Sequence, residues 1–273
     1  MLIEQPLRFA ANHLARPIVG GIDVVTTLEH FAIVTYAFEP ALLERYLPPR
    51  FEPVCIRLSD GRLRALVSAV PFHDRNFRGA RWPSPRLSFG QTNYRAYIRD
   101  RESGLDSVWF FGTTLDSLTV VVPRYLWKLP WYRGRIRFSC ATDRDGNYRR
   151  YAMITRSSWA PVELDLVDAG EPVSRLEGFP DLETGMLILT HPLTGFYRRR
   201  DGVLGSYSVW HDRLNPRAGA CRRARFGLLD RLGLVPFAYQ DRPYSVMLQP
   251  YTDFTIYLPP RKLDRSLVTE SKH

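Results

Sequence analysis

The stretch GQTNYRAYIRD, residues 90–100, alternates polar and apolar side chains with the two-residue period of a β-strand. One face of this strand carries its polar side chains: Gln91, Asn93, Arg95 and Tyr97. The opposite face, from Thr92 to Ile98, is more apolar. The polar face either meets water, or lines the mouth of a barrel in which Arg95 binds a ligand carboxylate through two hydrogen bonds. On sequence alone the first interpretation is favoured.

Strand-like segments lie on both sides of this stretch. They are HFAIVTYAF (30–38), RLRALVSAVPF (62–72), SVWFFG (107–112) and YSVMLQPYTDFTIYL (244–258). RIRFSC (135–140) and YRRYAMITRSS (148–158) flank the acidic turn TDRDGN and predict a hairpin. In the hairpin Ile136 and Phe138 share one face, and Arg135 and Arg137 share the other. The sequence therefore predicts an α+β protein that is mainly antiparallel β.

Helices are expected in three places. PALLERYL (40–47) is short and helical in composition. In TLDSLTVVVPRYLWKLP the apolar residues have helical spacing, with Asp116 or Ser117 as N-cap and Pro123 as a kink or a delay. The residues with that spacing are Leu115, Leu118, Val122, Tyr125, Leu126 and Leu129. PRAGACRRARFGLLDRLG (216–233) predicts a longer helix that ends at Gly233.

Composition indicates one soluble, cytoplasmic domain. The chain has 273 residues, and its 45% hydrophobic content is enough for a sizeable core. It has no apolar run long enough to span a bilayer and no signal-peptide pattern at its start. The three cysteines and six histidines are scattered, which argues against a disulfide framework and a metal site. Neither a metal nor another cofactor is expected.

The net charge of +10 raises the hypothesis of a polyanion-binding surface, formed by the arginines at 133–156 and 217–231. Only three lysines accompany 35 arginines, and the basic residues are spread along the chain. This pattern is typical of a codon-composition bias. Nucleic-acid binding is therefore the less favoured hypothesis.

Lys128 stands in the aromatic, arginine-rich segment VVVPRYLWKLPWYRGRI, residues 120–136. A lysine nucleophile must be unprotonated, so its pKa must fall well below about 10.4. Burial beside Trp127 and Trp131, or proximity to Arg124, would lower the pKa of Lys128. A lysine that covers aromatic rings with its stem and keeps its ammonium group in water is the commoner arrangement.

His211, in VWHDRLNP (209–216), is the other candidate for chemistry, because a neutral histidine can act as an acid or base near pH 7. Adjacent strand residues point to opposite faces, so Asp212 is not expected to orient it, and a structural histidine is favoured. The chain has no G-x-S-x-G, P-loop or G-x-G-x-x-G motif, which argues against the common hydrolase, NTPase and Rossmann classes. The catalytic residues stay unassigned, with Lys128 and His211 as candidates.

The order of several segments resembles the domain of unknown function 2071 family, a distant branch of the acetoacetate decarboxylase-like superfamily. The segments are HFAIVTYAFEPALLERYLPPRFEP, QTNYRAYI, VWFFGTTLD, PRYLWKLPWY, and SVWHDRLNP through FTIYLPPRKL. The resemblance covers about residues 24–263 of a single domain, 1–273. It leaves a short N-terminal extension and a flexible C-terminal tail.

The resemblance implies a closed or cone-shaped antiparallel β-barrel with a few packed helices and a small-molecule pocket. In acetoacetate decarboxylases a Gly-Phe-Pro-Lys-Lys-like stretch supplies the lysine that forms a Schiff base with the keto acid. Here Pro130 aligns with that proline, and Trp131 and Tyr132 align with the two lysines. Lys128 precedes the proline, and the acidic residue that helps catalysis falls near Gln91. Decarboxylation through a Schiff base is therefore not expected.

The expected function is a pocket for a small carboxylate or carbonyl compound, in a lyase-type enzyme that does not use a Schiff-base lysine. Arg95 and Arg124 would hold an anionic group, while Trp109, Trp131 and Tyr132 would enclose an apolar body. The expected ligand-binding residues also include the polar side chains of Gln91, Asn93 and Tyr97. The alternatives are a non-catalytic ligand-binding protein of the same fold and a basic polyanion-binding protein. The expected partner is a small organic acid or carbonyl compound, no membrane partner is expected, and a homo-oligomer is left open.

Overall fold

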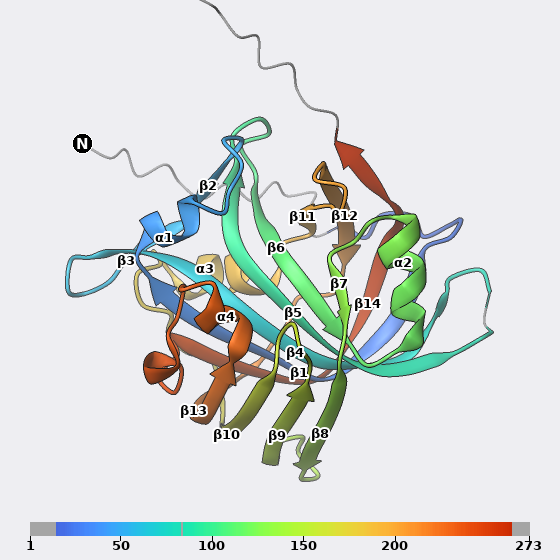
Figure 1. Cartoon of the computed structure of the whole chain (residues 1–273). Helices are drawn as coiled ribbons and strands as arrows, with labels where there is room; N and C mark the ends of the chain where they lie inside the picture. Colours follow the sequence, from blue (N-terminus) through green and yellow to red (C-terminus); the bar gives the residue numbers. More distant parts are fainter. Residues whose placement is uncertain (1–14, 83, 264–273) are drawn as a thin grey trace, which may run out of the picture.

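The computed structural model describes residues 15–82 and 84–263 (Figure 1). Seven strands close into a barrel, because the last of them pairs back with the first. In barrel order they are β1 (Val24–Phe38), β4 (Leu63–Gly79), β5 (Leu87–Asp100), β6 (Asp106–Leu115), β11 (Thr194–Arg198), β12 (Leu204–Trp210) and β14 (Ser245–Leu263). Every pairing in the ring is antiparallel except that of β6 with β11. The mainly antiparallel fold and the closed barrel are confirmed.

A second layer continues from the barrel through β14. Its strands are β13 (Arg217–Phe226), β10 (Val162–Pro172), β9 (Tyr148–Arg156) and β8 (Arg135–Thr142). In Figure 1 this layer lies below the barrel, under the crossing strands β1, β4 and β5. Three short strands pair with barrel strands: β2 (Phe51–Pro53), β3 (Cys55–Arg57) and β7 (Trp131–Arg133).

The helical elements are short. They are α1 (Pro40–Glu44), η2 (Leu118–Val120), α2 (Val121–Leu126), α3 (Leu182–Thr190), α4 (Gly227–Arg231) and η3 (Phe237–Tyr239). Within the described residues, no helix is long and apolar enough to cross a membrane. The expected N-terminal extension and C-terminal tail lie largely outside the described residues.

Two hydrophobic cores form on opposite faces of the barrel wall, because side chains alternate along each strand. The outer core lies between the wall and the second layer and includes Val34, Val67, Tyr94, Ala96, Met153, Leu164 and Phe226. The inner core lies inside the barrel and includes Phe31, Leu66, Val70, Phe72, Tyr97, Phe110 and Leu189. Both faces of β4 and β5 are therefore buried.

The strands and the hairpin expected from sequence are confirmed. β8 pairs with β9 across the acidic turn, with Ile136 buried and Arg135 and Arg137 exposed. The helix at the start of PALLERYL is present as α1. Of the expected segment 244–258, all residues from Ser245 onward belong to one continuous strand, β14, which pairs with three other strands.

The helix predicted over residues 216–233 is wrong for most of its length. Residues 217–226 form β13, which lies between β10 and β14, and only the five-residue α4 follows. Buried Ala224 and Phe226 alternate with Arg223 and Arg225, which is a strand period. Ladder pairing on both sides outweighed the helical composition. The expected end at Gly233 is correct, since its N–H donates to Asp230 O at 2.8 Å and its φ is positive.

The helix predicted over TLDSLTVVVPRYLWKLP is much shorter than expected. Leu115 ends β6, Ser117 Oγ accepts a hydrogen bond from Thr119 N at the start of η2, and α2 spans six residues. Pro123 lies in the first turn of α2, where a missing N–H costs little. The helical spacing does not mark a buried face, because four of its members are more than half exposed: Leu118, Val122, Tyr125 and Leu126.

Candidate functional site

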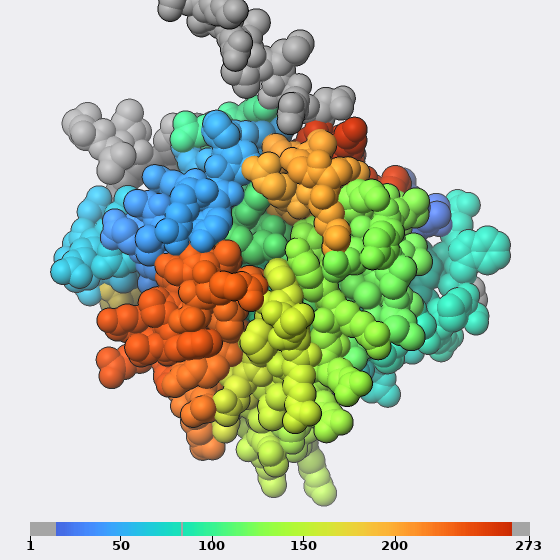
Figure 2. Space-filling view, in the orientation of Figure 1, coloured from blue at the N-terminus to red at the C-terminus, as the bar shows by residue number. Residues whose placement is uncertain are grey.

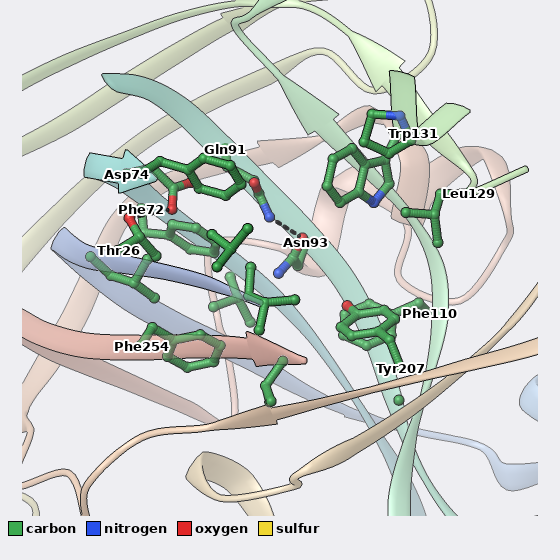
Figure 3. Close-up of a pocket in the computed structure, with 18 of the residues that line it drawn as sticks. Thr26, Phe72, Asp74, Gln91, Asn93, Phe110, Leu129, Trp131, Tyr207 and Phe254 are labelled. Atoms are coloured by element: carbon green, nitrogen blue, oxygen red, sulfur yellow. Dashed lines mark hydrogen bonds between the residues drawn. The ribbon is translucent and has the colours of Figure 1, made fainter. Parts of the chain in front are cut away.

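The barrel interior holds a cavity of about 260 Å³. Its walls are mainly apolar, and they include Phe72, Phe110, Leu129, Trp131 and Phe254 (Figure 3). The segment from Thr119 to Trp127, which contains α2, closes one side. Hydrogen bonds from Arg199 and Arg200 to the carbonyls of Trp127 and Lys128 join this segment to the region after β11. The two regions meet in one continuous surface in Figure 2.

The polar face of β5 points into this cavity, which overturns the interpretation favoured by the sequence. Gln91, Asn93 and Arg95 line it. Tyr97, the next member of the row, is fully buried beyond them; its hydroxyl lies 2.8 Å from Ser68 Oγ and donates to Leu189 O at 3.1 Å. The barrel closes around this face, so it is shielded from bulk water.

The side chains of Gln91 and Asn93 are hydrogen-bonded to each other. Asn93 Oδ1 accepts hydrogen bonds from Gln91 Nε2 at 3.0 Å and from Thr113 Oγ1 at 2.7 Å, and the first is drawn in Figure 3. A carbonyl oxygen has two lone pairs, so this acceptor is saturated. The Asn93 side chain is therefore left with its amide N–H donors for a ligand.

Arg95 is buried, with only 8% of its surface exposed. Its Nη2 donates to Leu189 O at 2.7 Å, and its guanidinium lies 5.6 Å from the centre of the Tyr97 ring. Leu189 O is one of the last carbonyls of α3, which favour a nearby cation. Among the described residues, Arg95 is in no ion pair, and its Nε has no hydrogen-bond partner.

His211 lines the cavity near Arg95. Its Nδ1 lies 2.8 Å from the backbone oxygen of Asp212, and its ring stacks on Phe254 at 5.0 Å and meets His191 edge-on at 4.7 Å. The pKa of His211 is lowered to about 4, mainly by burial and to a smaller extent by His191 and Arg95, while its hydrogen bond to the Asp212 backbone opposes this shift. The imidazole is therefore neutral near pH 7.

Asp74, on β4, is a cavity residue that the sequence analysis did not single out. Its side chain is buried, its Oδ1 accepts from Thr26 Oγ1 at 3.0 Å, and burial raises its pKa to about 7. Extending the alternation of Val70 and Phe72 by one step would have placed Asp74 on the inner face. No sequence signal marked that face as the wall of a cavity.

Several other predicted site residues lie outside the cavity. Trp131 lines it, but the next residue, Tyr132, points away and stacks on Trp159 at 4.0 Å. Arg124 donates to Trp131 O at 2.6 Å and lies over the Tyr132 ring. Trp109 packs with Phe51 and Phe196 in a separate cluster.

Lys128 is half-buried in the connection after α2 and is not among the residues that line the cavity. No lysine lies among the described lining residues. Trp131 occupies the wall at the position that the resemblance aligns with the Schiff-base lysine. Within residues 15–82 and 84–263, no group of three or more His, Cys, Asp and Glu side chains is placed to hold a metal ion.

Residues 25–252 match the family model of domain of unknown function 2071, described as an uncharacterized conserved protein. The chain belongs to this family. No curated protein matches the sequence.

Solved structures show which fold this family member has. The enduracididine biosynthesis enzyme MppR, complexed with the condensation product of pyruvate and imidazole 4-carboxaldehyde, is similar with a TM-score of 0.57 and 13% identity over 90% of each chain. Acetoacetate decarboxylase from Legionella pneumophila is similar with a TM-score of 0.56 and 13% identity, over 93% of this chain and 94% of that one. An acetoacetate decarboxylase-like enzyme from Sphingomonas wittichii RW1 has a TM-score of 0.53 and 11% identity, over 90% of this chain and 94% of that one. The fold is therefore acetoacetate decarboxylase-like.

Proposed function

We propose that the cavity binds a small carboxylic acid with an apolar body, and that Arg95 receives its carboxylate. The observation that carries this proposal is the buried guanidinium of Arg95, which has no anionic partner among the described residues. Burying a charge without a counter-charge is expensive, so a partner is expected in the functional state. A carboxylate matches the planar fork of arginine with two parallel hydrogen bonds.

A purely structural role for Arg95 is the competing explanation. Its bond to Leu189 O satisfies one carbonyl at the end of α3, which a single donor could do. A guanidinium has five N–H donors, and this bond uses one of them. Arg95 also lines the cavity and its Nε has no hydrogen-bond partner among the described residues, which supports ligand binding in addition to capping.

The similar structures support the ligand class. MppR has been solved as a complex with pyruvate, which is a small carboxylate. The apolar walls here favour an acid with a larger hydrophobic part than pyruvate, because Phe72, Phe110 and Trp131 face the cavity.

We further propose a lyase-type reaction without a Schiff base as the activity to test. Asp74, with a pKa near 7, can give or take a proton at neutral pH. The neutral His211 near Arg95 is a second candidate for proton transfer. Non-catalytic binding is the alternative, and turnover of the bound compound, followed by NMR, separates the two.

The first experiment is a thermal-shift screen of the purified protein against keto acids, aliphatic acids and aryl acids, with heparin as a separate arm. A ligand at 100 times its Kd stabilises the protein by roughly 2.7 kcal/mol, which raises Tm by about 5 °C for a chain of this length. Arg95→Met should abolish the shift. Arg150→Met, which removes an equal charge from an exposed position on β9, should preserve it.

A shift that survives Arg95→Met would refute the carboxylate site. A shift with heparin alone, falling steeply with salt, would instead support the polyanion-binding alternative.

A further inference from the structure

We infer that the ligand carries a hydroxyl group that binds Asp74, at the end of the cavity opposite the carboxylate. The ligand class is then a hydroxy acid, in which an apolar chain or ring system separates the hydroxyl from the carboxylate. This inference rests on the proposed function, since Arg95 defines the other end.

The carboxyl and the guanidinium of the cavity lie far apart along the barrel wall. Asp74 is opposite Phe89 in the β4–β5 ladder, whereas Arg95 is opposite Ser68. Six residues on each strand separate these levels, which corresponds to roughly 20 Å of strand. Asp74 and Arg95 form no ion pair with each other, although Asp74 carries the one carboxyl and Arg95 the one guanidinium among the described lining residues.

The wall between them is suited to an apolar spacer. Phe31, Val70 and Phe72 belong to the inner core and line the cavity on this stretch. Figure 3 shows Phe72 between Asp74 and Asn93, with Phe110 and Tyr207 farther along the wall. A ligand that reaches both ends therefore buries its middle against aromatic side chains.

Asp74 has an unused oxygen. Only 2% of the residue is exposed, and Oδ2 has no hydrogen-bond partner among the described residues. A buried polar atom without a partner costs free energy, so such atoms are rare unless a ligand completes them. Oδ1, by contrast, is already held by Thr26.

The chemistry of Asp74 selects a hydroxyl over other polar groups. Thr26 Oγ1 lies 3.0 Å from Asp74 Oδ1 and 3.2 Å from the backbone oxygen of Arg75. The threonine hydroxyl has a single proton, so it can donate fully to only one of these two oxygens. The proton of a neutral Asp74 can therefore lie on Oδ1, where it is donated to Thr26, or on Oδ2, where it faces the ligand. A hydroxyl matches both arrangements because it donates and accepts, whereas a carbonyl matches only the second.

Charged groups fit this end less well. A second carboxylate would meet the Asp74 carboxyl with no cation among the other described lining residues at that level. An ammonium group would require Asp74 to be ionised, which burial opposes. Simple dicarboxylates and amino acids should therefore bind more weakly than hydroxy acids of equal length.

The test uses matched pairs of acids of three lengths: octanoate, decanoate and dodecanoate, each against its ω-hydroxy acid. Isothermal titration calorimetry should show that the hydroxy acid of the best-fitting length binds about tenfold more tightly than its parent, the ratio for one buried hydrogen bond of about 1.4 kcal/mol. Asp74→Leu should bring this ratio to about one. Asp74→Asn, which keeps a donor and an acceptor, should retain a preference for the hydroxy acid.

Arg95→Met separates this inference from the proposed function, because it should weaken both members of every pair. If the acids bind through Arg95 but the hydroxyl adds nothing at any length, the inference is overturned while the carboxylate site stands. A preference that persists in Asp74→Leu overturns it in the same way.

If no acid depends on Arg95, the proposed function fails, and 1-decanol becomes the probe for Asp74. Weaker binding of 1-decanol to Asp74→Leu than to the unmodified protein would then support the hydroxyl site alone. Equal binding, or none, would overturn both proposals.

Discussion

Both faces of β5 are buried, but one is closely packed and the other borders a cavity. The outer face packs against the second layer so closely that a Cβ on Gly90 would lie 2.9 Å from Ile136. The inner face leaves a cavity of about 260 Å³ and turns an amide pair and an arginine towards it. Close packing contributes stability, whereas unfilled volume and unpaired polar groups reduce it. The outer core therefore stabilises the barrel, and the inner face is the surface proposed to bind a ligand.

The largest expected effect is the loss of stability on a substitution in the outer core. Phe226 is fully buried and packs edge-on against Tyr36 and Tyr94. Phe226→Ala should lower the free energy of unfolding by about 3 to 5 kcal/mol, measured by urea denaturation. Ligand affinity of the folded fraction should not change, and a selective loss of binding would contradict the division of roles between the two faces.

The second prediction concerns the inner face, where a substitution should raise the free energy of unfolding instead of lowering it. The pKa of Asp74 is raised from 3.8 to about 7 on folding, so its contribution to stability is full below about pH 4 and is lost as the pH rises through 7. Asp74→Asn stays neutral at every pH. Without ligand, this variant should equal the unmodified protein at pH 4 and exceed its stability by about 4 kcal/mol at pH 8, because each pKa unit corresponds to 1.36 kcal/mol.

Urea denaturation at the two pH values measures this difference. His211, whose pKa burial lowers to about 4, titrates in the same window, but it is present in both proteins and cancels in the comparison. An equal gain at both pH values would show that Asp74 does not change its protonation between them.

A smaller effect should separate charge from geometry at Arg95. Arg95→Lys keeps the cation but loses the fork that binds a carboxylate with two bonds. Its Kd for the best acid of the screen should rise about tenfold, which is less than the loss expected for Arg95→Met. Equal losses in both variants would show that the guanidinium geometry, rather than the charge, is responsible for binding.

No effect is expected at Lys128, which lies outside the cavity. Lys128→Arg should bind the same acids with unchanged affinity. Treatment of the unmodified protein with pyruvate and borohydride should leave its mass unchanged, because no lysine lies among the described lining residues. A trapped adduct that Lys128→Arg abolishes would revive Schiff-base chemistry.

The sequence predicted much of the fold, but not the placement of every element. Alternation identified β5 and the β8–β9 hairpin because each strand carries a two-residue period of its own. The helix predicted over residues 216–233 was wrong because β13 is held as a strand by β10 and β14, whose sequences lie far from it in the chain. Ligand binding by the expected site residues stays a prediction: Gln91, Asn93, Arg95 and Trp131 line the cavity, while Tyr97, Trp109, Arg124 and Tyr132 are not among the lining residues.

By itself the sequence determined which side chains share a face, since that follows from the period of a strand. It also placed the chain in its family and predicted a barrel. Only the tertiary structure decided that the polar face of β5 lies inside the barrel, that Arg95 reaches Leu189 on α3, and that Asp74 meets Thr26 on β1. Those contacts join residues 94 and 48 positions apart, and ring closure brings them together. A side chain's burial and its missing partners depend on such distant segments, which no local pattern records.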